Sequence, residues 1–85
     1  MEIIEAESFR RSLAKLPRAV QQLYQTQVDR FRVNWRDPRL HTKRVRGLPE
    51  AYSFRVTRRY RALFVTRNQR TAVIFEIDHR KDIYR

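Results

Sequence analysis

Residues 52–84 decide the fold, and they read YSFRVTRRYRALFVTRNQRTAVIFEIDHRKDIY. Three short runs rich in Val, Ile, Phe, Tyr and Thr follow one another and are separated by polar turns, which is typical of β-strands. Because successive side chains of a strand point to opposite faces, each run has its own apolar side. The stretch therefore predicts a three-strand antiparallel meander.

The register of this meander follows from keeping the apolar side chains on one face. A three-residue connection at residues 58–60 puts Arg55 opposite Leu63, whereas a two-residue turn would mix charge into the apolar face. A two-residue turn at Asn68 and Gln69 is expected in the second hairpin. The predicted apolar face consists of Tyr52, Phe54, Val56, Ala62, Phe64, Val73, Phe75 and Ile77.

The opposite face of the meander is predicted to be exposed and to carry two arginines. Arg55 and Arg61 lie on it, and Arg61 is expected directly across from Glu76. Two exposed arginines, one of them beside a carboxylate, resemble a prepared anion site. The alternative is that these arginines only keep the sheet soluble, and composition alone does not decide between the two interpretations.

Composition and charge restrict the functional classes. The chain has a net charge of +11 and no cysteine. Residues 1–35 carry six basic and four acidic residues, whereas residues 36–85 carry 14 basic and five acidic ones. This asymmetry favours a polyanionic partner. Without cysteine there is neither a disulfide framework nor a thiolate metal site, and the two distant histidines argue against zinc, so we expect no metal and no cofactor.

The length of 85 residues predicts a single domain over residues 1–85. No apolar run approaches the length of a membrane span, and the N-terminal MEIIEAES lacks the regions of a signal peptide. The sequence therefore indicates a cytoplasmic protein with no membrane partner.

The first half of the chain predicts one strand and two helices. Residues 2–6 read as a strand, Ser8 as the N-cap of a helix from Phe9, and Pro17 as the start of a second helix over residues 18–34. An apolar stripe at helical spacing runs along both helices, and we interpret it as core rather than as a ligand site. Its members are Phe9, Leu13, Leu16, Val20, Leu23 or Tyr24, Val28, Phe31 and Trp35.

Together these elements predict an α+β fold. A small antiparallel β-sheet, made of the N-terminal strand and the meander, would have the N-terminal helical hairpin packed on one face. The basic loop HTKRVRGLPE, residues 41–50, precedes the meander and carries Lys43, Arg44 and Arg46. This loop is either a solvated charged segment or part of an anion site.

The order of these elements, with three motifs, resembles a known family. The motifs are KRVRGLPEAYSFRV (residues 43–56), YRALF (residues 60–64) and IDHRKDIYR (residues 77–85). With the helical hairpin closed at Leu16-Pro17, they resemble the RelE/ParE toxin superfamily of bacterial toxin–antitoxin systems over essentially the whole chain. The resemblance implies a small sheet with two helices on one face.

The resemblance also implies a function. The RelE branch cuts messenger RNA in the ribosomal A site without a metal: the ribose 2′-hydroxyl attacks the adjacent phosphorus and leaves a cyclic phosphate and a 5′-hydroxyl. The implied partners are messenger RNA, the ribosome and a cognate antitoxin that is acidic where it covers the basic face. Two alternatives stay open, namely a ParE-like inhibitor that binds DNA gyrase and a basic RNA-binding module without chemistry.

Site residues are carried over by their matches to the family motifs. Arg61 in YRALF matches the phosphate-binding arginine, Arg55 its strand neighbour, and His79 the basic position after the last strand. His79 is a base or an acid, or alternatively a structural histidine. Glu76 is a second candidate base, but its expected place opposite Arg61 favours the role of an orienting partner. The predicted catalytic residues are Arg55, Arg61, His79 and Tyr84. The predicted RNA-binding and phosphate-binding residues are Lys43, Arg44, Arg46, Arg80 and Lys81.

Overall fold

The computed structural model describes residues 1–79. Its elements are β1 (Glu2–Glu5), α1 (Glu7–Ala14), α2 (Arg18–Val33), the 3₁₀-helix η1 (Pro38–Leu40), β2 (Lys43–Arg44), β3 (Ala51–Arg55), β4 (Tyr60–Arg67) and β5 (Thr71–His79). Within this range no helix is long and apolar enough to cross a membrane.

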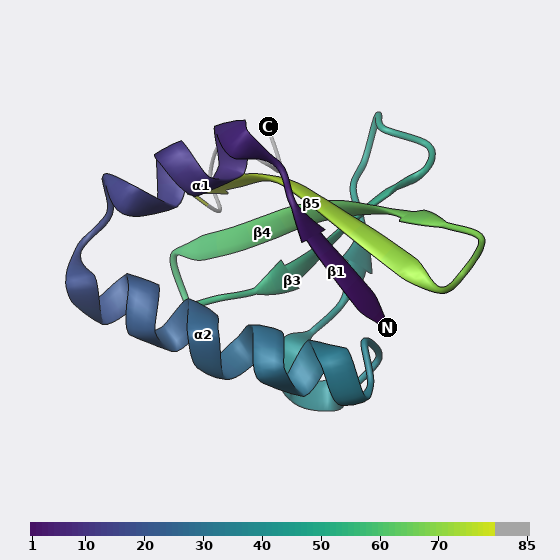
Figure 1. The fold of residues 1–85 in the computed structure, drawn as a ribbon, viewed down its shortest axis with the longest axis horizontal. Coiled ribbons are helices and arrows are strands. Elements are labelled where there is room, and N and C mark those ends of the chain that lie inside the picture. Colours follow the sequence, from purple (N-terminus) through teal and green to yellow (C-terminus); the bar gives the residue numbers. More distant parts are fainter. Residues whose placement is uncertain (80–85) are drawn as a thin grey trace.

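The strands form one twisted five-stranded sheet, with α1 and α2 packed against one of its sides (Figure 1). The strand order is β1-β5-β4-β3-β2. The α+β fold predicted from the sequence is confirmed, but the sheet is mixed rather than antiparallel because β1 runs parallel to β5. The backbone N–H of Glu2 donates to the carbonyl of Arg70 at 2.8 Å, so β1 starts beside the β4–β5 turn. The sequence of an edge strand carries no local signal for its direction, so the strand itself was predicted but its parallel direction was not.

The two helices form where the sequence predicts them, but the first one begins earlier. Helix α1 starts at Glu7, and its N-cap is Ala6, which makes no side-chain hydrogen bond. The predicted cap Ser8 instead donates its hydroxyl to the carbonyl of Phe75 at 3.1 Å, which ties α1 to β5. Helix α2 begins directly after Pro17, as expected.

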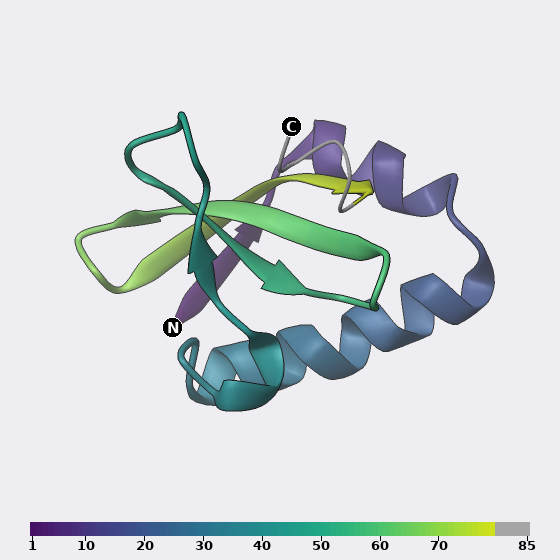
Figure 2. The same cartoon turned by 180° about the vertical axis from the view of Figure 1, so that it is seen from behind.

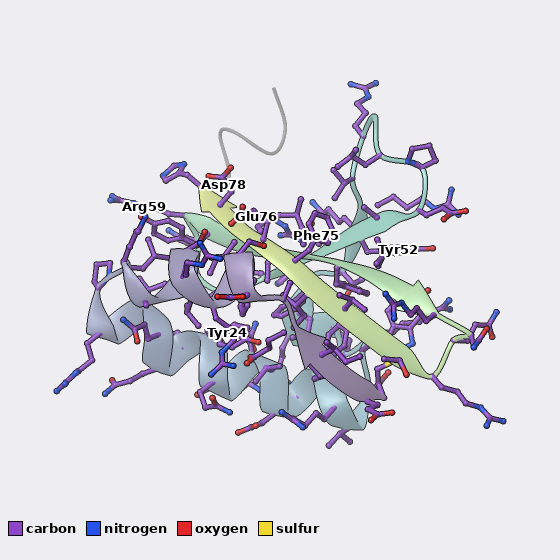
Figure 3. The ribbon with its side chains drawn as sticks, turned by 45° about the horizontal axis from the view of Figure 1, so that its top comes forward. Tyr24, Tyr52, Arg59, Phe75, Glu76 and Asp78 are labelled. Carbon is purple, nitrogen blue, oxygen red and sulfur yellow. The ribbon has the colours of Figure 1, made fainter. Side chains whose placement is uncertain are left out.

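Aromatic side chains form the core between the helices and the sheet. Phe31 of α2 lies 4.8 Å from Phe64 and 5.0 Å from Phe54, measured between ring centroids, and its ring meets Phe64 edge-on. Edge-on and tilted contacts are the favoured arrangements of aromatic rings. Tyr24 is buried in this core, whereas Leu23 is 48% exposed, so Tyr24 continues the stripe. Figure 3 shows Tyr24 on α2 beneath the sheet.

The first hairpin keeps its predicted faces although its register differs from the prediction. Arg55 pairs with Arg61, not with Leu63. Residues 56–59 connect the two strands, one residue more than expected, and the backbone N–H groups of Val56 and Thr57 both donate to the carbonyl of Tyr60, at 3.0 and 3.1 Å. A shift of two residues leaves every side chain on its face, so Phe54 still lies against the helices.

The second hairpin has a three-residue turn, and this reverses part of the predicted apolar face. Arg67 pairs with Thr71, which leaves residues 68–70 as the turn instead of residues 68 and 69. The buried residues of β5 beyond this turn are therefore Ala72 and Ile74, whereas Val73 and Phe75 were predicted to be buried against the helices.

A β-bulge in β5 then restores the predicted side for the end of the strand. Phe64 pairs with Ile74 but Leu63 pairs with Glu76, so β5 holds one extra residue between these pairs. Beyond the bulge, Ile77 again faces the helices. The same shift places Asp78 across from Arg61, so the predicted Arg61–Glu76 pair is wrong.

A second, smaller apolar cluster covers part of the sheet face that points away from the helices, which we call the outer face. It comprises Val45, Ala51 and Leu63, with Val65 and Phe75 packed against them. Figure 2 shows the loop between β2 and β3, which carries Val45, projecting from the sheet away from both helices. The rest of the outer face, toward the β3–β4 turn, is polar: it carries Arg55 and Arg61, and also Glu76 and Asp78, which pair with Leu63 and Arg61.

Candidate functional site

Basic side chains gather on the outer face of the sheet at one end of β3 and β4. Arg55 pairs with Arg61, and Lys43 pairs with Ser53, which lies two residues before Arg55 in β3. Paired residues of antiparallel strands project to the same side, so these three basic side chains share the outer face. We call the group Lys43, Arg55, Arg61 and the neighbouring His41 the basic face.

Arg61 is the buried member of the basic face. The residue is 3% exposed, its Nε donates to Ser53 Oγ at 2.8 Å, and its Nη2 donates to the carbonyls of Ser53 and His41. The sequence predicted this arginine on an exposed surface. The structure corrects that expectation, because Arg61 joins β3 to the segment that leads into β2 and thereby fixes the backbone at His41.

His41 is a candidate residue that the sequence analysis missed. It follows η1 in the left-handed backbone region, with φ 48°, and its side chain is exposed. The positive charge of Arg55 lowers the pKa of His41, and partial desolvation and the charges of Arg61 and Lys43 act in the same direction. A neutral imidazole beside cations is able to accept a proton from a hydroxyl. The only sequence signal was its position two residues before Lys43, and the pattern did not show that this segment lies against the sheet.

A buried amide holds the end of β3 in place. Gln27 of α2 is 6% exposed, and its Nε2 donates to the carbonyl of Arg39 at 3.0 Å and to that of Arg55 at 2.8 Å. Its Oε1 accepts from Arg30 Nη1 at 2.8 Å. Gln27 thus links α2, η1 and β3, and it anchors the backbone from which the Arg55 side chain projects.

A pocket of about 470 Å³ adjoins the basic face at the β2 edge of the sheet. His41 and Lys43 line it together with Trp35 and Tyr52. Its acidic residue Asp37 lies beside Arg39, whose hydrogen bonds lower the pKa of the carboxyl to about 2. The pocket therefore joins aromatic and basic surface.

The remaining predicted site residues lie elsewhere or outside the described range. His79 pairs with Tyr60, their ring centroids are 5.5 Å apart, and Tyr60 packs against the core on the helix side. His79 is therefore on the opposite face of the sheet from Arg55 and Arg61. Arg44 pairs with Tyr52 on that same helix side, and Arg46 is exposed in the β2–β3 loop. Arg80, Lys81 and Tyr84 lie outside the described residues.

Comparison with solved structures defines the class of this fold. No protein-family model matches the sequence, and no curated protein sequence matches it. The structure is similar to a chain of the RelB–RelE antitoxin–toxin complex of Methanococcus jannaschii, with a TM-score of 0.71, 20% identity, and 95% of this chain and 94% of that chain covered. It is also similar to a chain of the toxin–antitoxin complex RelBE2 of Mycobacterium tuberculosis, with a TM-score of 0.64, 28% identity, and 93% and 96% covered.

A third similar structure is the YoeB/ParE toxin of Agrobacterium tumefaciens, with a TM-score of 0.66, 14% identity, and 93% and 98% of the two chains covered. The chain has the RelE/ParE toxin fold. The resemblance seen in the sequence motifs is confirmed at this level.

Proposed function

We propose that this chain is the toxin of a type II toxin–antitoxin system and that it cleaves messenger RNA on the ribosome. The observation that carries the proposal is the basic face, where Lys43 and Arg55 flank a histidine whose pKa is lowered. Arg61 and Gln27 hold this arrangement through buried hydrogen bonds. The fold class supports the toxin assignment, since similar chains come from antitoxin–toxin complexes.

The proposed reaction is an internal phosphoryl transfer. The ribose O2′ attacks the adjacent phosphorus, the bond from phosphorus to O5′ breaks, and the products are a cyclic phosphate and a 5′-hydroxyl. His41 takes the proton of the 2′-hydroxyl, and Lys43 and Arg55 stabilise the charge that develops on the phosphate oxygens. The leaving O5′ takes a proton from an acid. His79 lies on the opposite face of the sheet from Arg55, so the proposed acid is Tyr84, which lies outside the described residues. Protein cations supply the positive charge, so the reaction is proposed to need no metal.

The proposed protein partner is an antitoxin with an acidic segment. Such a segment would cover the basic face, because a surface with this excess of positive charge is complementary to carboxylates. Binding there would block the phosphate site directly.

The second candidate function is inhibition of DNA gyrase by protein binding. One similar structure is described as a YoeB/ParE toxin, so the fold class alone does not separate a nuclease from a ParE-like gyrase inhibitor. Under this alternative, the basic face would bind protein or DNA and perform no proton transfer.

The experiment that separates the two is primer extension on messenger RNA from a translating extract, run beside a gyrase supercoiling assay. The nuclease proposal predicts cuts that recur at a fixed position within codons and require ribosomes. Intact messenger RNA together with trapped gyrase–DNA complexes would overturn it in favour of the gyrase inhibitor.

A further inference from the structure

Two adjoining hollows lie beyond the end of α2, one at the β2 edge of the sheet and the other toward Met1 and the β4–β5 turn. The first is the pocket of about 470 Å³ beside His41 and Lys43. The second measures about 270 Å³ and shares Trp35, Arg36 and Tyr52 with the first. We call the two hollows and their shared wall the Trp35 pocket. The larger hollow lies within the volume range of small-molecule sites in proteins, and the smaller one lies just below it.

The walls of the Trp35 pocket interleave aromatic rings with guanidinium groups. The rings of Trp35 and Tyr52 meet edge-on with 5.7 Å between their centroids. The guanidinium carbon of Arg36 lies 4.6 Å from the Trp35 ring centroid, and that of Arg44 lies 5.8 Å from the Tyr52 ring centroid. Aromatic rings and arginine planes are the surfaces on which unpaired nucleobases stack.

Neighbouring contacts hold this wall in position. The hydroxyl of Thr42 donates to the carbonyl of Trp35 at 2.7 Å, and the backbone N–H of Arg36 donates to Asn34 Oδ1 at 3.0 Å. The Tyr52 ring stacks against Phe64 of the core, at an interplanar angle of 23°. The pocket is thus partly built before any ligand arrives, which lowers the entropic cost of binding.

The charges around the pocket favour a base that belongs to a nucleic-acid strand. His41 and Lys43 line the pocket and are also members of the basic face, so the two sites are continuous. A phosphate on the basic face and a base in the pocket are then parts of one strand. Bases inside an RNA duplex are not accessible for such stacking, so the strand must be single.

We propose that the Trp35 pocket binds an unpaired nucleobase of single-stranded RNA, whose backbone lies on the basic face. This inference rests on the proposed RNA-directed function and deepens it by naming the site that contacts a base.

Trp35 is the single tryptophan of the chain, so its intrinsic fluorescence reports directly on this pocket. The test titrates the full chain at low salt with a short single-stranded RNA and with an abasic oligonucleotide of equal length and charge. End-label anisotropy measures binding of both, because phosphate contacts alone bind a basic protein. RNA should quench Trp35 and bind roughly tenfold more tightly than the abasic strand, and the abasic strand should leave Trp35 unquenched.

Two arginine variants make the test specific. Arg36→Ala removes a stacking plane while it keeps the tryptophan reporter, and it should lower RNA affinity several-fold more than abasic affinity. Arg59→Ala removes the same charge from an exposed site at the opposite end of the sheet from Tyr52 (Figure 3), and it should weaken both strands equally.

The outcomes for the pocket and for the nuclease are distinguishable. Equal binding of RNA and abasic strand, with no quenching by RNA, would overturn the base pocket even if messenger RNA is still cut. Quenching that an acidic peptide causes and RNA does not would assign the pocket to a protein partner and overturn the proposal as well. RNA-specific quenching supports the base pocket whether or not the chain cleaves messenger RNA. The nuclease proposal is contradicted separately, by intact messenger RNA in the primer-extension experiment.

Discussion

The buried amide of Gln27 offers the sharpest test of how the site is held. Gln27→Leu keeps the approximate size of the side chain but removes the two donors that serve the carbonyls of Arg39 and Arg55. A buried acceptor that loses its donor costs about 1–3 kcal/mol. In Gln27→Leu, two carbonyl acceptors each lose their donor. Burial of the more hydrophobic leucine side chain offsets part of this cost, so we expect the free energy of unfolding to fall by about 2–3 kcal/mol.

Thermal unfolding followed by circular dichroism measures this effect. For a domain of this length each 1 kcal/mol lowers Tm by about 4–8 °C, so Gln27→Leu should lower Tm by about 10–20 °C. Gln25→Leu is the matched control, because Gln25 is exposed on the same helix and its Nε2 donates to Asp29 Oδ1, also on the helix surface, at 3.2 Å. The control should change stability by less than about 0.5 kcal/mol. Equal Tm values for the two variants would refute the view that Gln27 anchors β3.

Three further predictions concern other parts of the molecule. The NMR titration of His41 should give a pKa below its ordinary value of 6.5, and Arg55→Ala should raise that pKa because Arg55 is the largest cause of its depression; equal midpoints would contradict this. Tyr24→Phe removes the hydroxyl that donates to Glu5 Oε2 at 2.5 Å. Its cost in urea unfolding should be about 1 kcal/mol, and an unchanged midpoint would show that the bond contributes nothing. Gly47 has φ 84° and nothing near an added Cβ, so Gly47→Ala should cost about 1 kcal/mol from backbone strain alone. Gly47→Asn should cost less, since asparagine tolerates this region, and equal losses would contradict the assignment.

Much of the fold could be predicted because it follows from periodicity. The helical stripe identified Phe9, Val28 and Phe31 as core, and all three are fully or almost fully buried. Strand alternation put Phe54 and Phe64 on the helix face, which is also correct. These patterns reflect burial against a continuous surface, and burial is what a repeating apolar spacing records.

Turn length and strand direction could not be predicted in the same way. Asn68 and Gln69 both have positive φ, at 53° and 57°. Neither is a glycine, the residue that would have indicated a particular turn type. The bulge makes Phe75 the extra residue of β5, and no turn residue or glycine in the strand marks its position.

The candidate site was only partly accessible from the sequence. Alternation placed Arg55 on the face away from the helices, as the structure has it. The burial of Arg61 depends on Ser53 and on the carbonyl of His41, which meet it only in the folded chain. The position of His79 could have been inferred, since a residue two after Ile77 in a strand shares its face. The roles assigned to these residues in catalysis stay proposals.

The central claim is that the basic face cleaves RNA, and Arg55 tests it most directly. Single-turnover cleavage of ribosome-bound messenger RNA should fall about 100-fold in Arg55→Ala, because a positioned charge on the reacting phosphate is lost. Arg59→Ala removes an exposed arginine from the nearby β3–β4 turn and should retain cleavage within about threefold. The account predicts this difference, with 5′-hydroxyl ends on the wild-type products. Equal rates for the two variants, or 5′-phosphate ends, would contradict it.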